Sequence, residues 1–255
     1  MKGFSFFTLL SLFASSLYGQ SYGYKKATHE QEGKVLPYRI LLPEGYTMDK
    51  KYPLLLFLHG SGERGNDNKL QLVHGSELFL AEDFRKKHPA IVVFPQCPKD
   101  EYWATVIDRQ GPLKFDFPKK PKNNPTLDLL EGMLESILLN YGVDKNRVYI
   151  GGLSMGGMGT FEMVYRNPRR FAAAFAICGG ANPKIARKIR RPAWRIDHGE
   201  VDDVVPVQLS ILMADALREQ KANVQLRLYP EANHNSWENV FADPTFLPWL
   251  FAQSN

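Results

Sequence analysis

Cysteine is scarce in this sequence, since only Cys97 and Cys178 occur among its 255 residues. So low a count excludes a disulfide-rich scaffold, and no further cysteine or histidine stands near either one at the spacing of a zinc motif. We therefore expect no metal site. Two separate buried thiols are the preferred prediction. A bridge between them stays open, because two is an even count.

Long apolar runs are missing after the N-terminus. The stretch from Phe4 to Leu17 is mostly apolar, follows Lys2 and is followed by small or neutral residues up to Gly19. It is short for a membrane-spanning helix, and the layout is typical of a secretory signal peptide. We expect that residues 1–19 are removed during export. The mature protein would then not be stably inserted in a membrane, and it would be secreted or periplasmic. An uncleaved anchor is the alternative.

A strong charge of one sign is absent too. The formal net charge is +5, and the basic residues are scattered apart from short clusters at 85–87 and 187–191. No nucleic-acid-binding motif accompanies these clusters, so we expect a solvated basic face and no nucleic-acid partner. The chain is 44% hydrophobic, which is enough for one core. Residues 20–255 are therefore predicted to form a single domain.

What the sequence does contain is an alternation of strands and helices. Predicted strands cover 38–43, 53–58, 90–94, 147–150, 171–177, 193–196 and 224–229, and predicted helices cover 127–141, 155–166 and 207–220. Several strands are continuous apolar runs, which suits strands covered on both faces. The pattern predicts an α/β fold with a mostly parallel central sheet, helices on both faces and functional residues at the carboxyl ends of the strands.

Two connections differ from the others. Residues 97–126 form a long segment rich in proline, lysine, aspartate and asparagine. A loop of that length in a compact domain is usually functional. Residues 179–192, by contrast, are too few to insert a lid domain.

A G-x-S-x-G motif, Gly152-Leu153-Ser154-Met155-Gly156, stands between the predicted strand 147–150 and the predicted helix 155–166. That context is the one in which a serine on a tight turn projects its hydroxyl above the sheet. Glycines on both sides keep side chains out of the turn. We predict that Ser154 is a nucleophile, the alternative being an inert serine in a glycine-rich turn.

A serine hydroxyl needs a neighbouring base, and the base needs an acid to orient it. His234 follows the predicted strand 224–229, and Asp202 follows the predicted strand 193–196. The chain order Ser, Asp, His is the one found in α/β-hydrolases. Asp203 is the neighbouring alternative to Asp202. The remaining histidines are predicted to be surface or structural residues: His29, His74, His88 and His198.

The glycine loop after the first long apolar strand is a candidate oxyanion hole. It reads His59-Gly60-Ser61-Gly62 and can present a backbone N–H to a developing negative charge. We predict that the two donors are the amides of Ser61 and Met155. His59 is expected to support this loop and not to carry a proton.

Four segments resemble the α/β-hydrolase superfamily, and more narrowly small secreted single-domain esterases: the phospholipase/carboxylesterase group, feruloyl-esterase-like and polyhydroxybutyrate-depolymerase-like enzymes and "predicted peptidase" relatives. The segments are Leu58–Gly62, Gly152–Gly157, His198–Pro206 and Asn233–Trp237. The resemblance implies Ser154 as nucleophile, Asp202 as acid and His234 as base. It also implies acyl transfer through an acyl-enzyme, with no metal or organic cofactor.

Three functions compete at this stage. A carboxylic ester hydrolase is preferred over a serine peptidase related to prolyl oligopeptidases, because no peptide-selecting domain is present, and over a non-catalytic binding protein, because no triad member is missing. Tyr102, Trp103 and Trp237 are candidate substrate contacts by stacking. The predicted substrate is a short-chain or aromatic ester, small or attached to a polysaccharide. The alternative is that these aromatics only pack the loop. No oligomeric state is predicted.

Overall fold

An eight-stranded, mostly parallel sheet forms the centre of the computed structural model, which describes residues 23–108 and 114–255. The strands are β1 (Lys25–Gln31), β2 (Lys34–Leu41), β3 (Tyr52–Leu58), β4 (Ile91–Pro95), β5 (Val143–Leu153), β6 (Ala173–Ile177), β7 (Ala193–Gly199) and β8 (Val224–Tyr229). Their spatial order is β1-β2-β4-β3-β5-β6-β7-β8. The β1–β2 and β2–β4 pairs are antiparallel, and all other pairs are parallel.

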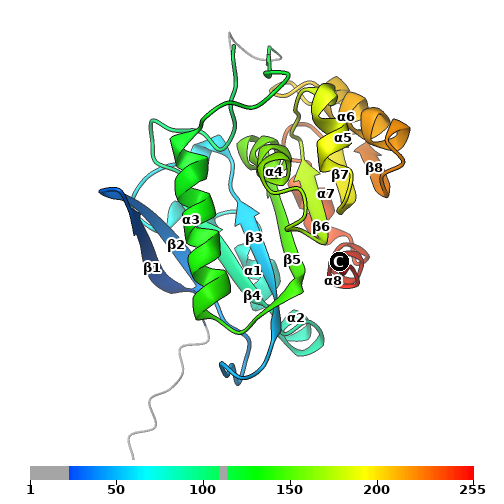
Figure 1. Cartoon of the computed structure of the whole chain (residues 1–255). Helices are drawn as coiled ribbons and strands as arrows, with labels where there is room; N and C mark the ends of the chain where they lie inside the picture. The colour runs from blue at the N-terminus through cyan, green and yellow to red at the C-terminus, as the bar shows by residue number, and fades with distance from the viewer. Residues whose placement is uncertain (1–22, 109–113) are drawn as a thin grey trace, which may run out of the picture.

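Helices cover both faces of this sheet (Figure 1). They are α1 (Ser76–Leu80), α2 (Glu82–Lys87), α3 (Pro125–Asn140), α4 (Met155–Arg166), α5 (Ala186–Ile189), α6 (Val207–Glu219), α7 (Trp237–Ala242) and α8 (Phe246–Phe251). The described part of the chain also contains three short 3₁₀ helices: η1 (Ser61–Glu63), η2 (Leu70–Leu72) and η3 (Pro183–Ile185). The predicted α/β-hydrolase fold is confirmed.

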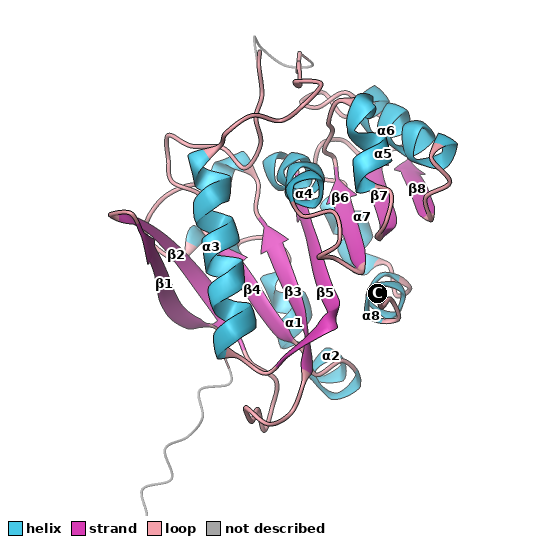
Figure 2. Cartoon of the chain, in the orientation of Figure 1, coloured by secondary structure: helices cyan, strands magenta, loops and turns pink. Residues whose placement is uncertain are grey.

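Two hydrophobic clusters divide the core between the two faces of the sheet. One joins the sheet to α3, α4, α5 and α6, which lie in front of it in Figure 2. The other joins the sheet to α1, α2, α7 and α8 on the opposite face. The central strand β3 is buried along its whole length, as its continuous apolar sequence predicts. Truncating a fully buried leucine such as Leu56 costs about 2–5 kcal/mol.

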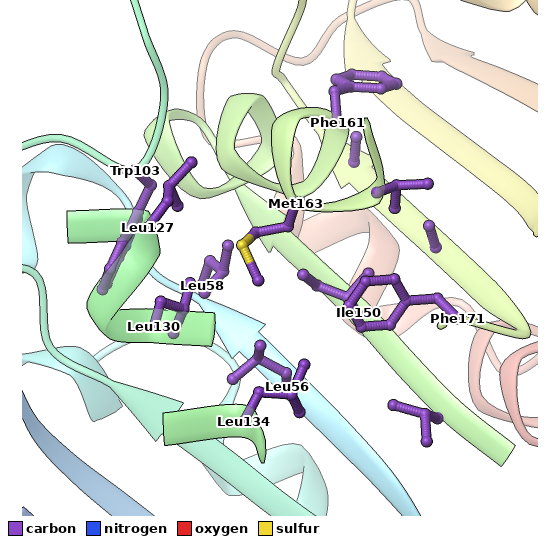
Figure 3. Packing of buried hydrophobic residues seen from close by; sticks show 14 of the residues in the cluster. Leu56, Leu58, Trp103, Leu127, Leu130, Leu134, Ile150, Phe161, Met163 and Phe171 are labelled. Carbon is purple, nitrogen blue, oxygen red and sulfur yellow. The ribbon is translucent and has the colours of Figure 1, made fainter. Parts of the chain in front are cut away.

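The longest helix, α3, begins two residues before its predicted start, at a capping residue that the sequence analysis did not single out. The Asn124 side chain accepts hydrogen bonds from the amides of Thr126 and Leu127 at 3.1 and 3.2 Å, and Pro125 occupies the first turn. Both features satisfy or remove backbone donors that the helix itself leaves unpaired. The helix carries its apolar side chains onto the sheet beside α4 (Figure 3).

Some predicted boundaries differ from the observed ones. Strand β5 starts at Val143, four residues before the predicted start, and β7 runs on to Gly199. Strand β1 and five short helices were not predicted: α1, α2, α5, α7 and α8. Only η3 and α5 lie between β6 and β7, so no lid domain interrupts the described chain there. The predicted signal peptide, residues 1–19, lies outside the described residues. Within them, no helix has the length and apolarity needed to cross a bilayer.

Candidate active site

Ser154 occupies a strained turn between β5 and α4. Its backbone has φ 53° and ψ −117°, a conformation that residues other than glycine rarely adopt. A side chain on Gly156 would approach the carbonyl oxygen of Leu58 to 2.0 Å, and one on Gly152 would approach it to 2.3 Å. Glycine is therefore required on both sides, because β3 passes directly beside the turn. The turn holds the Ser154 hydroxyl at the carboxyl end of the central strands.

His234 connects the hydroxyl of Ser154 to a carboxylate. Its Nε2 lies 3.0 Å from Ser154 Oγ, and its Nδ1 lies 2.8 Å from Asp202 Oδ2. A carboxylate can only accept, so Nδ1 carries the proton and Nε2 is free to accept the serine proton. Asp203 is exposed and its backbone amide donates to Asn233, so Asp202 and not Asp203 faces the histidine.

The carboxylate of Asp202 is held by four donors. Oδ1 accepts from the amides of Val204 and Val205, both at 2.9 Å. Oδ2 accepts from His234 and, at 3.1 Å, from His198 Nε2. Burial alone would raise the pKa of Asp202, but these hydrogen bonds outweigh it and hold the pKa well below its ordinary value of 3.8. Asp202 is therefore a fixed negative charge at neutral pH.

His198 was expected to be structural, and it is fully buried at the end of β7. Its Nε2 also lies 3.0 Å from the carbonyl oxygen of Val205, and its Nδ1 lies 2.7 Å from Ser210 Oγ. Both groups facing Nε2 are acceptors, so this nitrogen carries a proton. The contact with Asp202 is one that sequence analysis missed, although the spacing within His198-Gly199-Glu200-Val201-Asp202 could have suggested it.

The predicted oxyanion loop lies next to the nucleophile. A β-carbon at Gly60 would stand 3.7 Å from the Ser154 β-carbon, so this glycine flanks the serine directly. Ser61 and Met155 each begin a helix, η1 and α4 respectively. Amides in the first turn of a helix have no acceptor within that helix, which leaves them available to a substrate. Arg64 stabilises the loop by donating to the carbonyl oxygen of Ser61 at 2.9 Å.

His59 forms hydrogen bonds that hold the predicted oxyanion loop in place. Its Nε2 accepts from the amide of Cys97 at 2.9 Å, and its Nδ1 lies 2.6 Å from the carbonyl oxygen of Gly60. Burial lowers the pKa of His59 to about 4, so the ring is neutral and Nδ1 is its donor. The expected scaffolding role agrees with these contacts, which join the ends of β3 and β4.

The three aromatic residues predicted to contact substrate differ in their burial. Trp103 is fully buried between α3 and the sheet beside Leu127, and its ring packs against His59 (Figure 3). The prediction that Trp103 offers a face to substrate is therefore wrong, because the loop turns this side chain into the core. Tyr102 is half-buried, with its hydroxyl 3.7 Å from the Met158 sulfur at the first turn of α4. Trp237 is half-buried and stands edge-on to His234, with ring centres 5.6 Å apart.

The long loop after β4 is fastened over α4. The buried Glu162 accepts from the Thr105 amide at 2.6 Å and from the Thr105 hydroxyl at 2.8 Å. Burial raises the pKa of Glu162, although these two hydrogen bonds oppose the shift. Farther along, Asn182 donates to the carbonyl oxygen of Phe117 at 2.9 Å. Ala104 and Phe117 of this loop also pack with Met158 of α4 and with Val205, so the loop borders the segments that carry Ser154 and Asp202.

Both cysteines are free and buried, as preferred from the sequence. Ligand atoms of Cys178, Asp202 and His234 lie within 4.8 Å of one another, a grouping that sequence spacing did not reveal because three different strands lead to it. Burial, with Asp202 nearby, raises the pKa of the Cys178 thiol well above its ordinary range. A protonated thiol is a poor metal ligand, and the other two side chains already bind each other. These residues fit the hydrogen-bonded chain better than a metal ion.

The remaining histidines differ in their distance from the serine–histidine–aspartate chain. His29 contacts Gln31 in β1, and His88 stacks on Phe251 of α8. His74 is half-buried, and its ring contacts that of Trp237 with centres 5.0 Å apart. It is therefore closer to the site than expected.

A family model described as Phospholipase/Carboxylesterase matches residues 46–245. The chain belongs to this family. The chain is also similar to curated proteins. It is 31% identical over 116 residues to a bifunctional acetylxylan esterase/xylanase of Neocallimastix patriciarum, and this match covers 42% of this chain and 17% of the relative. It is 27% identical over 135 residues to lysophospholipase-like protein 1 of Mus musculus, covering 50% of this chain and 54% of the relative.

Solved structures of esterases share the fold of this phospholipase/carboxylesterase family member. A thermostable esterase superposes with a TM-score of 0.81 at 34% identity, covering 91% of this chain and 63% of that one. A ferulic acid esterase from Anaeromyces mucronatus superposes with a TM-score of 0.62 at 20% identity, over 85% of this chain and 86% of that one. The chain spans less than two thirds of the length of the two curated relatives and of the thermostable esterase.

Proposed function

We propose that this chain is a serine carboxylic ester hydrolase. The observation that carries the proposal is the continuous hydrogen-bonded path from Ser154 Oγ through His234 to Asp202, with distances of 3.0 and 2.8 Å. The serine lies on the G-x-S-x-G turn between β5 and α4, and membership of the phospholipase/carboxylesterase family supports ester hydrolysis.

The first half-reaction forms an acyl-enzyme. His234 Nε2 takes the proton of the Ser154 hydroxyl as Oγ attacks the ester carbonyl carbon. The carbonyl oxygen becomes an oxyanion and accepts hydrogen bonds from the amides of Ser61 and Met155. His234 then donates its new proton to the alcohol oxygen, the carbon–oxygen bond breaks and the alcohol leaves. Asp202 stabilises the imidazolium throughout, because its own charge is held at neutral pH.

The second half-reaction restores the serine. Water gives a proton to His234 Nε2 while its oxygen attacks the acyl carbon. The same two amides bind the second oxyanion, Ser154 Oγ leaves, and His234 returns the proton to it. The products are one carboxylic acid and one alcohol, and no cofactor takes part.

For substrate, we propose short-chain or aromatic esters met outside the cytoplasm, including substituents on polysaccharides. The short β6–β7 connection gives no cover for a long acyl chain. Tyr102 contacts Met158, one turn after Ser154 in α4, and Trp237 contacts His234, so both are candidate aromatic contacts for a substrate. The names of the acetylxylan and ferulic acid esterases that the chain is similar to agree with this class. Export rests on the predicted signal peptide, and mass spectrometry of the exported protein should find a mature N-terminus near Gln20.

The decisive test is Ser154→Ala. Turnover of p-nitrophenyl acetate should fall by about 10⁴-fold or more, and labelling by a fluorophosphonate probe should vanish, while the thermal transition is retained. A panel of p-nitrophenyl esters from acetate to decanoate, methyl ferulate, acetylated xylan and a peptide anilide defines the substrate. Faster cleavage of the anilide than of any ester would replace the esterase proposal with the peptidase one.

A further inference from the structure

Basic residues gather at the amino ends of the parallel strands. Strands β3 to β7 are neighbours in the order β4-β3-β5-β6-β7 and run in one direction, so they begin at a common edge, the lower one in Figure 1. Each of these strands has two basic residues at its start or shortly before it. The pairs, which together are called the basic edge, are Lys50-Lys51, Lys86-Lys87, Lys145 with Arg147, Arg169-Arg170 and Arg190-Arg191.

Much of the charge on the basic edge is not compensated by acidic side chains. Lys86, Lys87, Arg147 and Arg170 pair with acids, but these pairs are partly or largely exposed to solvent, where ion pairs are weak. The other six residues are exposed and form no salt bridge with any residue that the structure describes: Lys50, Lys51, Lys145, Arg169, Arg190 and Arg191. Like charges held this close repel one another, so the basic edge attracts anions.

The basic edge is hollowed in two places. One hollow, of about 350 Å³, is lined by Lys50, Lys51 and Arg147 among others. A second hollow, of about 510 Å³, is lined by Lys145 and Arg169 among others. Lys145 and Arg147 are two positions apart on β5, so one short stretch of this strand supplies a cation to each hollow. Concave surfaces accept a polymer chain, whereas a membrane presents a nearly flat face.

The lining of the smaller hollow indicates which kind of anion fits. Pro89, which is exposed, and His88, which is half-buried, add ring surface to the surrounding cations. A sugar ring that carries a carboxylate offers an apolar C–H face and a negative charge, which match these two features. Single-stranded nucleic acid needs exposed aromatic faces for its bases. The aromatic side chains of this hollow, Tyr52 and Phe251, are buried, so nucleic acid fits less well.

We propose that the basic edge binds an acidic polysaccharide, a polymer whose sugar rings carry carboxylates. Neighbouring strands lie about 4.8 Å apart, so five strands spread the cations over about 20 Å, which suits a chain with repeated charges better than one small anion. Ser154 lies at the opposite, carboxyl ends of the strands, so a bound polymer leaves the active site free.

Such binding would hold the enzyme on a polymer and raise the effective concentration of the esters attached to that polymer or to its neighbours. The choice of a polysaccharide rests on the function proposed above, which places the enzyme among polymer-linked esters. The binding itself is a property of the basic edge and is measured without catalysis.

The test compares two soluble polymers that share one backbone, carboxymethyl cellulose and hydroxyethyl cellulose. Neither contains an ester, so hydrolysis does not disturb the measurement of Kd by titration calorimetry. The full chain should bind the carboxymethyl form, with an affinity that falls steeply as salt is added, because salt screens exposed charges. It should not bind the uncharged hydroxyethyl form. Failure to bind carboxymethyl cellulose, or equal binding of both polymers, would overturn the proposal.

Two variants that each lose four positive charges from the net charge of +5 locate the binding surface. The edge variant carries Lys50→Gln, Lys51→Gln, Lys145→Gln and Arg169→Gln. The matched variant changes exposed lysines of the loops that follow β3 and β4, and carries Lys69→Gln, Lys99→Gln, Lys120→Gln and Lys122→Gln. The edge variant should weaken Kd by about tenfold or more, and the matched variant by no more than about twofold. Melting curves confirm that both variants are folded.

The remaining outcomes decide between occupants and separate this inference from the proposed function. An equal loss of affinity in both variants would assign binding to overall charge and overturn the basic edge as a site. Tighter binding of oligo(dT), or of vesicles containing phosphatidylserine, than of carboxymethyl cellulose at equal charge concentration would replace the polysaccharide with a nucleic acid or a membrane. Failure of the wild type to hydrolyse any ester would overturn the esterase function, and the polymer titrations would still decide the binding.

Discussion

His198 Nε2 lies 3.1 Å from Asp202 Oδ2, the same oxygen that faces the catalytic candidate His234. Two imidazoles thus share one carboxylate oxygen, one of them fully buried and one reaching the substrate side. The buried ring is itself fixed by Ser210, whose hydroxyl lies 3.1 Å from the carbonyl oxygen of Gly179. His198, together with the amides of Val204 and Val205, therefore orients Asp202 in addition to His234.

Replacing His198 should reduce catalysis without changing substrate binding. His198→Ala removes one of the hydrogen bonds that lower the Asp202 pKa, so that pKa should rise towards its ordinary value and kcat should fall by about tenfold at unchanged KM. His198→Gln keeps a donor and should restore part of the loss. Rate–pH profiles and melting curves of both variants check this. If His198→Ala lowered the melting temperature but kept the wild-type kcat, His198 would have a role in packing and none in catalysis.

Substitutions of the adjacent residues Asp202 and Asp203 should have very different effects on kcat. Asp202→Asn takes away the acceptor that fixes the His234 tautomer, and kcat should fall by roughly 10³–10⁴-fold. Asp203 is exposed and has only its backbone amide bonded to Asn233, so Asp203→Asn should leave kcat almost unchanged. Steady-state kinetics of the two purified variants provides the comparison. The reverse ranking would identify Asp203 as the acid.

Trp103 should behave as a core residue. Its side chain is fully buried against His59 and α3, so Trp103→Ala should lower the free energy of unfolding by about 3–5 kcal/mol. The ratios of kcat/KM among substrates should stay as in the wild type at temperatures where the variant is folded. Urea denaturation measures the first effect, with Leu139→Ala at an exposed position of α3 as the control. A selective loss of one substrate at full stability would return Trp103 to the substrate site.

Asp243 should make stability depend on acid pH. It pairs with Arg195 and Arg227, and although burial alone would raise its pKa, hydrogen bonds from Thr245 and Arg195 lower it to about 2. Because the folded pKa lies below the ordinary 3.8, the stabilisation is present above about pH 5 and is lost as the pH falls towards 2.

The measurement compares Asp243→Asn with the wild type by urea denaturation at pH 7 and pH 3. The difference in free energy of unfolding should be larger at pH 7. Asp215→Asn, in an exposed pair with Arg218 on α6, should show little difference at either pH. An Asp243→Asn deficit that is equal at both pH values would contradict the pKa argument.

The elements that carry chemistry could be predicted because each has a strong local signal. Ser154 stands between glycines after a buried strand, and His234 and Asp202 each follow a strand in the required order. The short helices α1, α2, α7 and α8 span five or six residues each. Such segments complete less than two helical turns, so their apolar periodicity is too brief to recognise.

Contacts between distant segments escaped prediction for a different reason. Trp103 and Tyr102 are neighbours in one loop, yet the first is in the core and the second only half-buried, and nothing in the local sequence separates them. His74 contacts both Glu63 and Trp237 because the chain after β3 folds back against α7. These contacts depend on tertiary packing, which cannot be inferred from the residues adjacent in the sequence.

The two outer strands of the sheet have a consequence for association between copies. Within residues 23–108 and 114–255, strand β1 pairs with β2 alone and strand β8 with β7 alone, so each presents one side without a partner strand. The first carries Lys25, Lys26 and Glu30, and the second carries Gln225 and Arg227. Adding a strand from another molecule would bring these charged and polar groups together at close range, and charged edges of this kind oppose such growth. The charged and polar side chains on both edge strands therefore disfavour the addition of further strands and growth into a fibre.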